Sequence, residues 1–223
     1  MKTDARDFLL STLLIGLNLA ASAFALSLCW PLVTTLAGSF AQVVCALLAP
    51  ATYGLCTAAS LALLGRFHPL REGEYDLAHE QFTQWKVRHV VAELGKLALS
   101  LYFPVFARAA FYALFGTRVG RQVAVAGKIL DPGLTVLEEG CVLGEGCIVT
   151  SHTMWGERFV MREVHVGANA TVGVGCILMP GVRVGSRAVL LPGSVVKTGT
   201  VIGSGEIWGG VPASRLKGPG DHA

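Results

Sequence analysis

One histidine, His152, stands where a regular pattern in the sequence is interrupted. Before it, aliphatic residues recur at a spacing of six as far as Val149, and after it the pattern restarts at Val166 in a different phase. The segment between them therefore leaves the repeating structure and returns to it, and residues on such excursions from a rigid scaffold often carry function. Histidine exchanges protons near neutral pH, so His152 could act as a general base toward a hydroxyl or an amine. The alternative is a structural role, in which the ring bonds a loop carbonyl.

A histidine base usually needs an acidic partner, and two carboxylates are candidates. Asp131 precedes His152 by slightly more than one turn of the repeat, about 18 residues, so it could come near along the axis. Glu157 lies on the same excursion as His152. The carboxylate of either residue could bond the His152 ring nitrogen that does not accept the proton. Alternatively, either residue could be a solvated surface residue. Asp131 could instead start the turn that leads into Pro132.

The repeat itself has a period of six residues, which is neither helical nor a simple alternation. Glycine often follows the aliphatic position, and a compact residue such as Cys, Ala or Ser often stands four positions after it. These features predict a triangular coil whose aliphatic residues point inward and stack on the next coil, with hydrogen bonds along the axis. We therefore expect a parallel β-helix over 118–217. After the interruption the repeat holds its register through Val166, Val172, Leu178, Val184, Leu190, Val196, Ile202 and Trp208.

This pattern resembles the hexapeptide-repeat transferase family, which also ends with a motif like GlyGlyValProAlaSer at 209–214. The resemblance implies a left-handed β-helix and homotrimers with sites in clefts between subunits. It is closest to the membrane-linked terminal domains of some nonribosomal peptide synthetases. That likeness lies in AspProGlyLeu at 131–134, SerHisThr at 151–153, GluArgPheValMetArgGluValHisValGly at 157–167 and LeuLeuProGlySerValValLys at 190–197.

The resemblance also implies a chemistry. His152 would deprotonate an acceptor that attacks an acyl thioester directly, while backbone N–H groups hold the oxyanion. The pantetheine arm would pass Gly173 and Gly175, and cationic side chains would meet the donor's phosphates, with ordinary solvated charges as the alternative. Leu191 and Pro192 are bulkier than is usual in the family, so the donor is either acyl-CoA or an acyl phosphopantetheine on a carrier protein. The candidate cations are Lys197, Arg215 and Lys217.

The first third of the chain has the composition of a membrane segment. The 223 residues are 52% hydrophobic and 15% charged, and no Asp, Glu, Lys or Arg occurs between Asp7 and Arg66. A membrane span needs roughly 20 residues, so we expect a helical hairpin within 1–66, with spans at 8–30 and 40–64. The basic residues at its two ends predict a multi-pass inner-membrane protein with the β-helix on the cytoplasmic side. These residues are Lys2, Arg6, Arg66, His68 and Arg71. A signal peptide over 1–25 is the alternative. The six cysteines form no C-x-x-C pair, and we expect them to be small buried residues.

Residues 67–117 should link the membrane hairpin to the β-helix. We expect a polar linker with a turn at 73–76, then an amphipathic helix in the membrane interface over 89–115, kinked at Pro104. Its aromatic anchors would be Tyr102, Phe103, Phe106, Phe111, Tyr112 and Phe115. A buried connecting helix is the alternative. A tail over 218–223 completes the chain.

Three functions are compatible with these features. The first is a trimeric acyltransferase anchored in the lipid bilayer, and the second is a non-catalytic scaffold for a biosynthetic synthetase. The third is a zinc enzyme like the γ-class carbonic anhydrases, which needs three histidines. His152, His165 and His222 do not have the required spacing, so we expect no metal. A net charge of +3 without a basic stripe does not support nucleic-acid binding.

Overall fold

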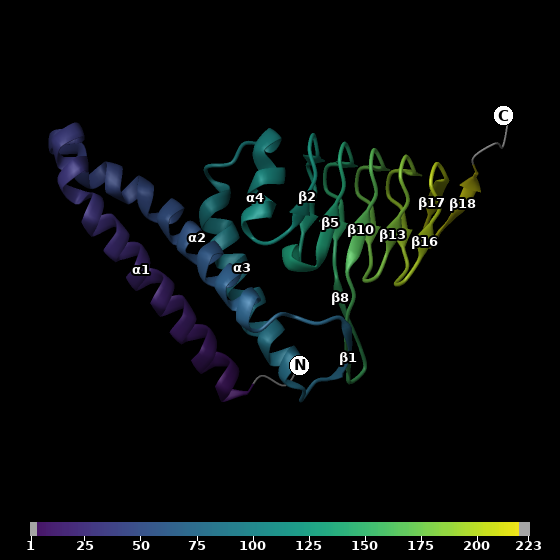
Figure 1. Ribbon diagram of the computed structural model, residues 1–223, viewed down its shortest axis with the longest axis horizontal. Helices are drawn as coiled ribbons and strands as arrows, with labels where there is room; N and C mark the ends of the chain where they lie inside the picture. The colour runs from purple at the N-terminus through teal and green to yellow at the C-terminus, as the bar shows by residue number, and fades with distance from the viewer. Residues whose placement is uncertain (1–3, 219–223) are drawn as a thin grey trace. The chain divides into compact units, whose positions relative to one another are not determined.

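The computed structural model describes residues 4–218, which form two compact units (Figure 1). The helical unit contains residues 4–70 and 78–104, and the coil unit contains residues 71–77 and 105–218. The segment 67–117, expected as one linker with one helix, is therefore divided between the units. Lys2, His222 and all but the first residue of the 218–223 tail lie outside the described residues.

The helical unit begins with α1 (Ala5–Ala37), the short 3₁₀ helix η1 (Gly38–Phe40) and α2 (Ala41–Phe67). Their helical stretch, Ala5–Phe67, is long and apolar enough to cross a membrane, judged by length and composition alone. α1 and α2 pack on each other, and the hydroxyls of Ser22 and Thr52 are 2.7 Å apart. Cys29, expected to be buried, is exposed on α1.

The third helix of this unit, α3 (Glu80–Ser100), packs against both α1 and α2. Its Phe82, Val91 and Leu99 are buried. Gly95 lets α2 approach closely, because a Cβ there would lie 2.5 Å from Thr57 Cγ2. The single kinked helix expected over 89–115 is wrong: α3 starts earlier and ends at Ser100. Pro104 follows that end, and a proline has no N–H with which to continue a helix.

The coil unit starts with the 3₁₀ helix η2 (Val105–Ala107) and α4 (Arg108–Leu114), which packs on the first coil. Phe111, Tyr112 and Phe115, expected as membrane anchors, are instead buried, whereas Phe106 is 89% exposed. An open end of a β-helix exposes its apolar core, so a covering helix must bury its own aromatic side chains there. The guanidinium of Arg108 fixes this arrangement by donating to the carbonyl of Ala126 at 2.8 Å.

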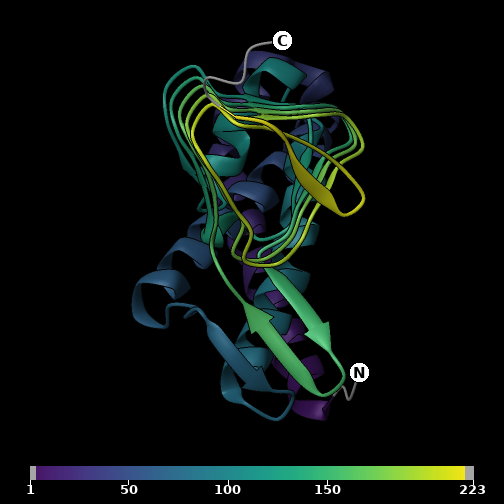
Figure 2. The same ribbon diagram turned by 90° about the vertical axis from the view of Figure 1, so that its right-hand side faces the viewer.

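The coil consists of three sheets of stacked parallel strands, as the repeat predicts, with a triangular outline when seen along the axis (Figure 2). The five-stranded sheet contains β2 (Arg118–Val119), β5 (Thr135–Leu137), β10 (Val164–Val166), β13 (Arg183–Val184) and β16 (Val201–Ile202). The six-stranded sheet contains β3 (Ala124–Val125), β6 (Val142–Leu143), β11 (Thr171–Val172), β14 (Val189–Leu190), β17 (Ile207–Gly210) and the antiparallel β18 (Ala213–Lys217). The four-stranded sheet contains β4 (Lys128–Ile129), β7 (Ile148–Val149), β12 (Ile177–Leu178) and β15 (Val195–Val196).

The register agrees with the inward positions expected from the sequence. Leu137, Val166, Val184 and Ile202 are paired in sequence along one sheet, and all are at most 2% exposed. The compact residues Cys141, Cys147 and Cys176 are fully buried at the corners. Burial raises the pKa of the Cys141 and Cys147 thiols to about 12, so both remain protonated and act as small apolar residues.

The interrupted segment forms a β-hairpin of β8 (His152–Trp155) and β9 (Arg158–Met161), which projects from one corner of the coil (Figure 2). A third strand, β1 (Gly73–Asp76), pairs antiparallel with β9. The turn expected at 73–76 is therefore wrong. The alternating exposure of these four residues, with Gly73 and Tyr75 more buried than their neighbours, fits an edge strand.

Candidate active site

The hairpin places His152 against Asp131. The Nδ1 atom of His152 lies 2.6 Å from Oδ2 of Asp131, although the two residues are 21 positions apart. The same carboxylate oxygen accepts the backbone N–H of Ser151 at 2.9 Å. Both side chains are largely enclosed, with 16% of His152 and 7% of Asp131 exposed.

The two residues meet because they occupy the same corner of neighbouring coils. Asp131 lies between β4 and β5, where the chain passes from the four-stranded to the five-stranded sheet. His152 leaves the coil after β7, at the equivalent point of the next coil, since Ile129 pairs with Val149. A 3₁₀ turn over Pro132–Leu134 adds length to the first of these corners and directs the Asp131 carboxylate along the axis.

The surroundings of His152 hold its ring in place. The Oγ1 of Thr150 donates to the backbone carbonyl of His152 at 2.8 Å and lies 3.4 Å from its Nδ1. The ring of Phe159, buried on β9, is tilted against the imidazole at a centroid distance of 6.2 Å. A carboxylate accepts a proton-bearing Nδ1, so the neutral ring carries its basic lone pair on Nε2. This is the arrangement in which a histidine accepts a proton from an acceptor group.

Glu157 takes no part in this contact. It lies at the turn between β8 and β9, at the opposite end of the hairpin from His152, and is exposed. Its backbone carbonyl accepts the N–H of Leu77, which follows β1. The expectation that Glu157 could orient His152 is therefore wrong, because a two-strand hairpin separates its tip from its base.

The residues predicted to contact the acyl donor lie at a different corner of the β-helix from His152. Gly173 follows β11, where the chain passes from the six-stranded to the four-stranded sheet, and Gly175 has a left-handed φ of 68°. A Cβ at Gly173 would lie 2.7 Å from the Leu190 carbonyl oxygen and from the Pro192 nitrogen. Only glycine therefore fits beside the backbone of residues 190–192. Leu191 itself is 40% exposed at this corner, one coil further along.

The three candidate cations lie in two different parts of the β-helix. Lys197 is exposed and follows β15, at the same corner as His152. Two strand spacings, about 10 Å, separate it from Thr150 along the axis. Arg215 and Lys217 lie on β18 at the end of the six-stranded sheet. Arg215 forms an ion pair with Glu206, at 3.3 Å between Nε and Oε1.

Glu206 is a residue that the sequence analysis missed. The indole N–H of Trp208 and the backbone N–H of Gly203 donate to its carboxylate and hold its pKa below the ordinary value. Glu206 stands four positions after Ile202, where the repeat otherwise has a compact residue. A charged residue at such a position was the available signal. Trp208 continues the inward register opposite Leu190, as expected, but is only half-buried in the last coil.

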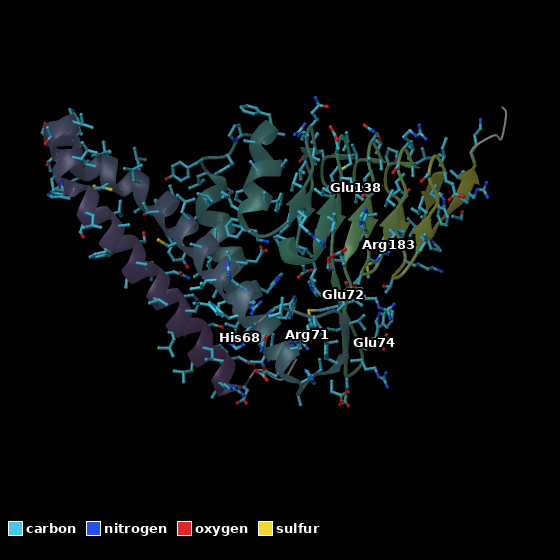
Figure 3. The ribbon with its side chains drawn as sticks, in the orientation of Figure 1. His68, Arg71, Glu72, Glu74, Glu138 and Arg183 are labelled. Carbon is cyan, nitrogen blue, oxygen red and sulfur yellow. The ribbon has the colours of Figure 1, made fainter. Side chains whose placement is uncertain are left out.

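The histidines of the coil do not converge within one chain. The Nε2 of His165, on the five-stranded sheet, lies 2.8 Å from Oε1 of Glu138, which Figure 3 labels. Within residues 4–218, no group of three or more His, Cys, Asp or Glu side chains could hold a metal ion.

Comparisons with known proteins agree with the coil. No protein-family model matches the chain. It is 31% identical over 93 residues to mitochondrial γ carbonic anhydrase 2 of Arabidopsis thaliana, a match that spans 42% of this chain and only 28% of that protein. Among solved structures, galactoside acetyltransferase in complex with coenzyme A covers 70% of this chain and 90% of its own length, with 15% identity and a TM-score of 0.51. A maltose O-acetyltransferase from Clostridium difficile 630 covers 66% and 93%, with 14% identity and a TM-score of 0.41. The fold of the coil is thus the hexapeptide-repeat β-helix.

Proposed function

We propose that this protein, whose coil shares its fold with galactoside acetyltransferase, is a membrane-anchored acyltransferase with His152 as general base. The observation that carries the proposal is the 2.6 Å contact between His152 Nδ1 and Asp131 in a largely enclosed corner. Asp131 would act as a positioning residue that fixes the tautomer of the ring. The donor would be an acyl-CoA or an acyl phosphopantetheine on a carrier protein, and the acceptor a hydroxyl or an amine.

A homotrimer of left-handed coils would complete the site. Within one chain, His152 and Gly173 lie at opposite edges of the four-stranded sheet, so a second copy is needed to bring donor and base together. Three of the four outward positions of that sheet support an interface, because Ile148, Ile177 and Val195 are aliphatic and half-buried there, while the first position is Lys128. Partly exposed apolar residues of this kind are typical of the core of a subunit interface.

Membrane anchoring is supported by the surface of the helical unit. Leu13, Leu17, Leu28 and Leu47 are each at least 60% exposed on α1 and α2. Contiguous apolar surfaces of this size are unfavourable in water and favourable in lipid. In this proposal α1 and α2 cross the inner membrane as a hairpin, and the coil lies on the cytoplasmic side, where thioester donors are available.

The test uses the full chain in lipid nanodiscs with acetyl-CoA or acetyl-phosphopantetheine as donor and a membrane lipid extract as acceptor, with thiol release and acetylated product as readouts. His152→Ala should lower kcat by roughly 100- to 10,000-fold, the range of general-base catalysis. Asp131→Asn should lower it within the same range, because an amide can donate to Nδ1 and favour the wrong tautomer. Glu157→Gln, at the hairpin tip, is the matched control and should retain activity.

The proposal would be overturned if His152→Ala kept wild-type activity. A wild-type protein that neither releases thiol nor gains thermal stability with either donor at high concentration would instead favour a non-catalytic scaffold for a biosynthetic synthetase.

A further inference from the structure

The helical unit contains a cavity of about 400 Å³ between α1, α2 and α3, and this cavity is open to the surface along α1, where Leu13 and Leu17 are exposed. This volume falls within the range of small-molecule sites, about 300 to 1,000 Å³. The cavity lies entirely within one unit and shares no residue with the corner that holds His152 and Asp131. Its lining is divided into an apolar wall and a polar end.

The apolar wall is a stripe along α1. Leu10, Leu13, Leu14 and Leu17 line the cavity at the spacing i, i+3, i+4 and i+7, which places them on one helix face. Seven residues of helix extend about 10 Å, long enough to lie along a section of an alkyl chain. Leu64 of α2 and Val87 of α3 add apolar surface from the other helices.

The polar end carries more positive than negative charge. Arg6 lies one turn before Leu10 on α1, and Arg88 of α3 donates to the backbone carbonyls of Leu64 and His68. Figure 3 shows His68 where α2 ends. The carboxylate that also lines this end, Glu80, accepts the side-chain N–H of Gln84 at 3.1 Å. The nearby Asp7 and Lys86 form an ion pair with each other, so they add no net charge.

Gln84 supplies a second, independent observation. Its Oε1 atom is buried and has no hydrogen-bond partner anywhere in residues 4–218, although the residue lines the cavity. A buried amide oxygen without a donor destabilises the folded protein. Because this atom is buried, a polar donor on a ligand would reach it only after the Gln84 side chain turns toward the cavity.

We propose that this cavity binds an acyl chain of an anionic membrane phospholipid, with the leucine stripe against the chain and Arg6 and Arg88 beside the phosphate. Guanidinium groups match phosphate oxygens in charge and geometry, and the apolar wall excludes a free phosphate as the whole ligand. The proposal rests on the proposed function in one respect, the membrane location of α1 and α2. It does not depend on acyl transfer.

The experiment places the full chain in phosphatidylcholine nanodiscs. Each of two preparations also contains a small fraction of one lipid spin-labelled on its acyl chain, which is phosphatidylglycerol in the first and phosphatidylcholine in the second. Electron paramagnetic resonance then measures the fraction of labelled lipid whose motion is restricted. The wild type should restrict phosphatidylglycerol several-fold more than phosphatidylcholine. Arg6→Gln should remove most of this preference, and Leu13→Trp, which fills the cavity, should reduce the restricted fraction of both lipids.

Two variants serve as matched controls. Arg66→Gln removes a nearby charge on α2 that does not line the cavity, and Leu19→Trp enlarges an exposed α1 residue outside it. Both should behave as the wild type. All four substitutions are at exposed positions, so the fold should be retained, which circular dichroism checks.

Equal restriction of the two lipids by the wild type, or equal effects of Arg6→Gln and Arg66→Gln, would overturn the lipid site while leaving membrane anchoring intact. Failure of the chain to remain in the nanodisc would reject the membrane location itself, and the lipid site with it.

Discussion

At the scale of single residues, the candidate base depends on groups that come from another coil. His152 meets Asp131 because two corners of the coil stack directly, and Ser151 binds the same carboxylate through its backbone. A carboxylate with two N–H donors is held in one position. Asp131 therefore both forms part of the corner and contacts His152, the proposed base.

Glu206 supports a prediction about pH. Its pKa is lowered in the folded protein, first by the Trp208 indole N–H and then by the Gly203 N–H. A lowered pKa stabilises the folded protein above the pKa of the unfolded chain, and this contribution is lost as the pH falls through the folded value. We expect Glu206→Gln to lower the melting temperature at pH 7, and the difference from wild type to disappear in acid. Melting curves from pH 7 downward, followed by circular dichroism, measure this. A difference that persists below the folded pKa would contradict the assignment, and Glu157→Gln at the hairpin tip is the control.

Arg215 is affected by the same contact. Its ion pair with Glu206 offsets part of its positive charge, so it would attract a phosphate less strongly than the sequence alone suggests. Lys197 lies at the same corner as His152, so in the proposed mechanism it would be the better placed cation.

At the scale of elements, the hairpin of His152 is held by a strand from a distant part of the sequence. β1 pairs with β9 along four residues, from Gly73 with Met161 to Asp76 with Arg158. Glu74 forms an ion pair with Arg162 at 2.7 Å, and Glu72 accepts the backbone N–H of Glu163 (Figure 3). An isolated two-stranded hairpin is only marginally stable in water. The third strand therefore stabilises the hairpin that carries His152.

Disrupting β1 should loosen the hairpin without unfolding the coil. Tyr75 pairs with Phe159, and Tyr75→Pro removes the backbone N–H of β1 at this pair and restricts its φ angle. We expect faster amide hydrogen exchange over 152–161, unchanged exchange in β11 to β15, and a lower kcat. Tyr75→Thr keeps the backbone N–H and a strand-forming side chain, so it should remain close to wild type. Unchanged exchange in the hairpin of Tyr75→Pro would show that β1 does not stabilise it.

At the scale of the whole molecule, the coil presents sheets with different outer surfaces. Three of the four outward positions of the four-stranded sheet are aliphatic, Ile148, Ile177 and Val195, and the first is Lys128, whereas those of the five-stranded sheet include Arg118, His165 and Arg183. The aliphatic sheet is the one that separates His152 from Gly173. An interface on it would assemble the two halves of the proposed site.

A charged residue on the aliphatic sheet should therefore break the trimer. We expect Ile177→Arg to change the mass of the detergent-solubilised protein from trimer to monomer in size-exclusion chromatography with light scattering. Activity should fall with it, because the site is completed between copies. Val201→Arg, on the five-stranded sheet and 67% exposed, is the matched control. A monomeric wild type, or a trimeric Ile177→Arg, would contradict the assembly.

The sequence by itself determined the repeat, its inward residues and the position of His152 at the interruption. These features follow from a six-residue period that every turn of the β-helix repeats, so a short stretch of sequence is enough to predict them. Only the tertiary structure decided that Asp131 rather than Glu157 meets His152, that the interruption is a hairpin completed by β1, and that the aromatic residues of α4 cover the end of the coil. Each of these contacts joins residues far apart in the sequence and outside the repeat. Which residues meet in these contacts therefore depends on how the corners and strands of the β-helix stack in space, and a local sequence pattern does not predict it.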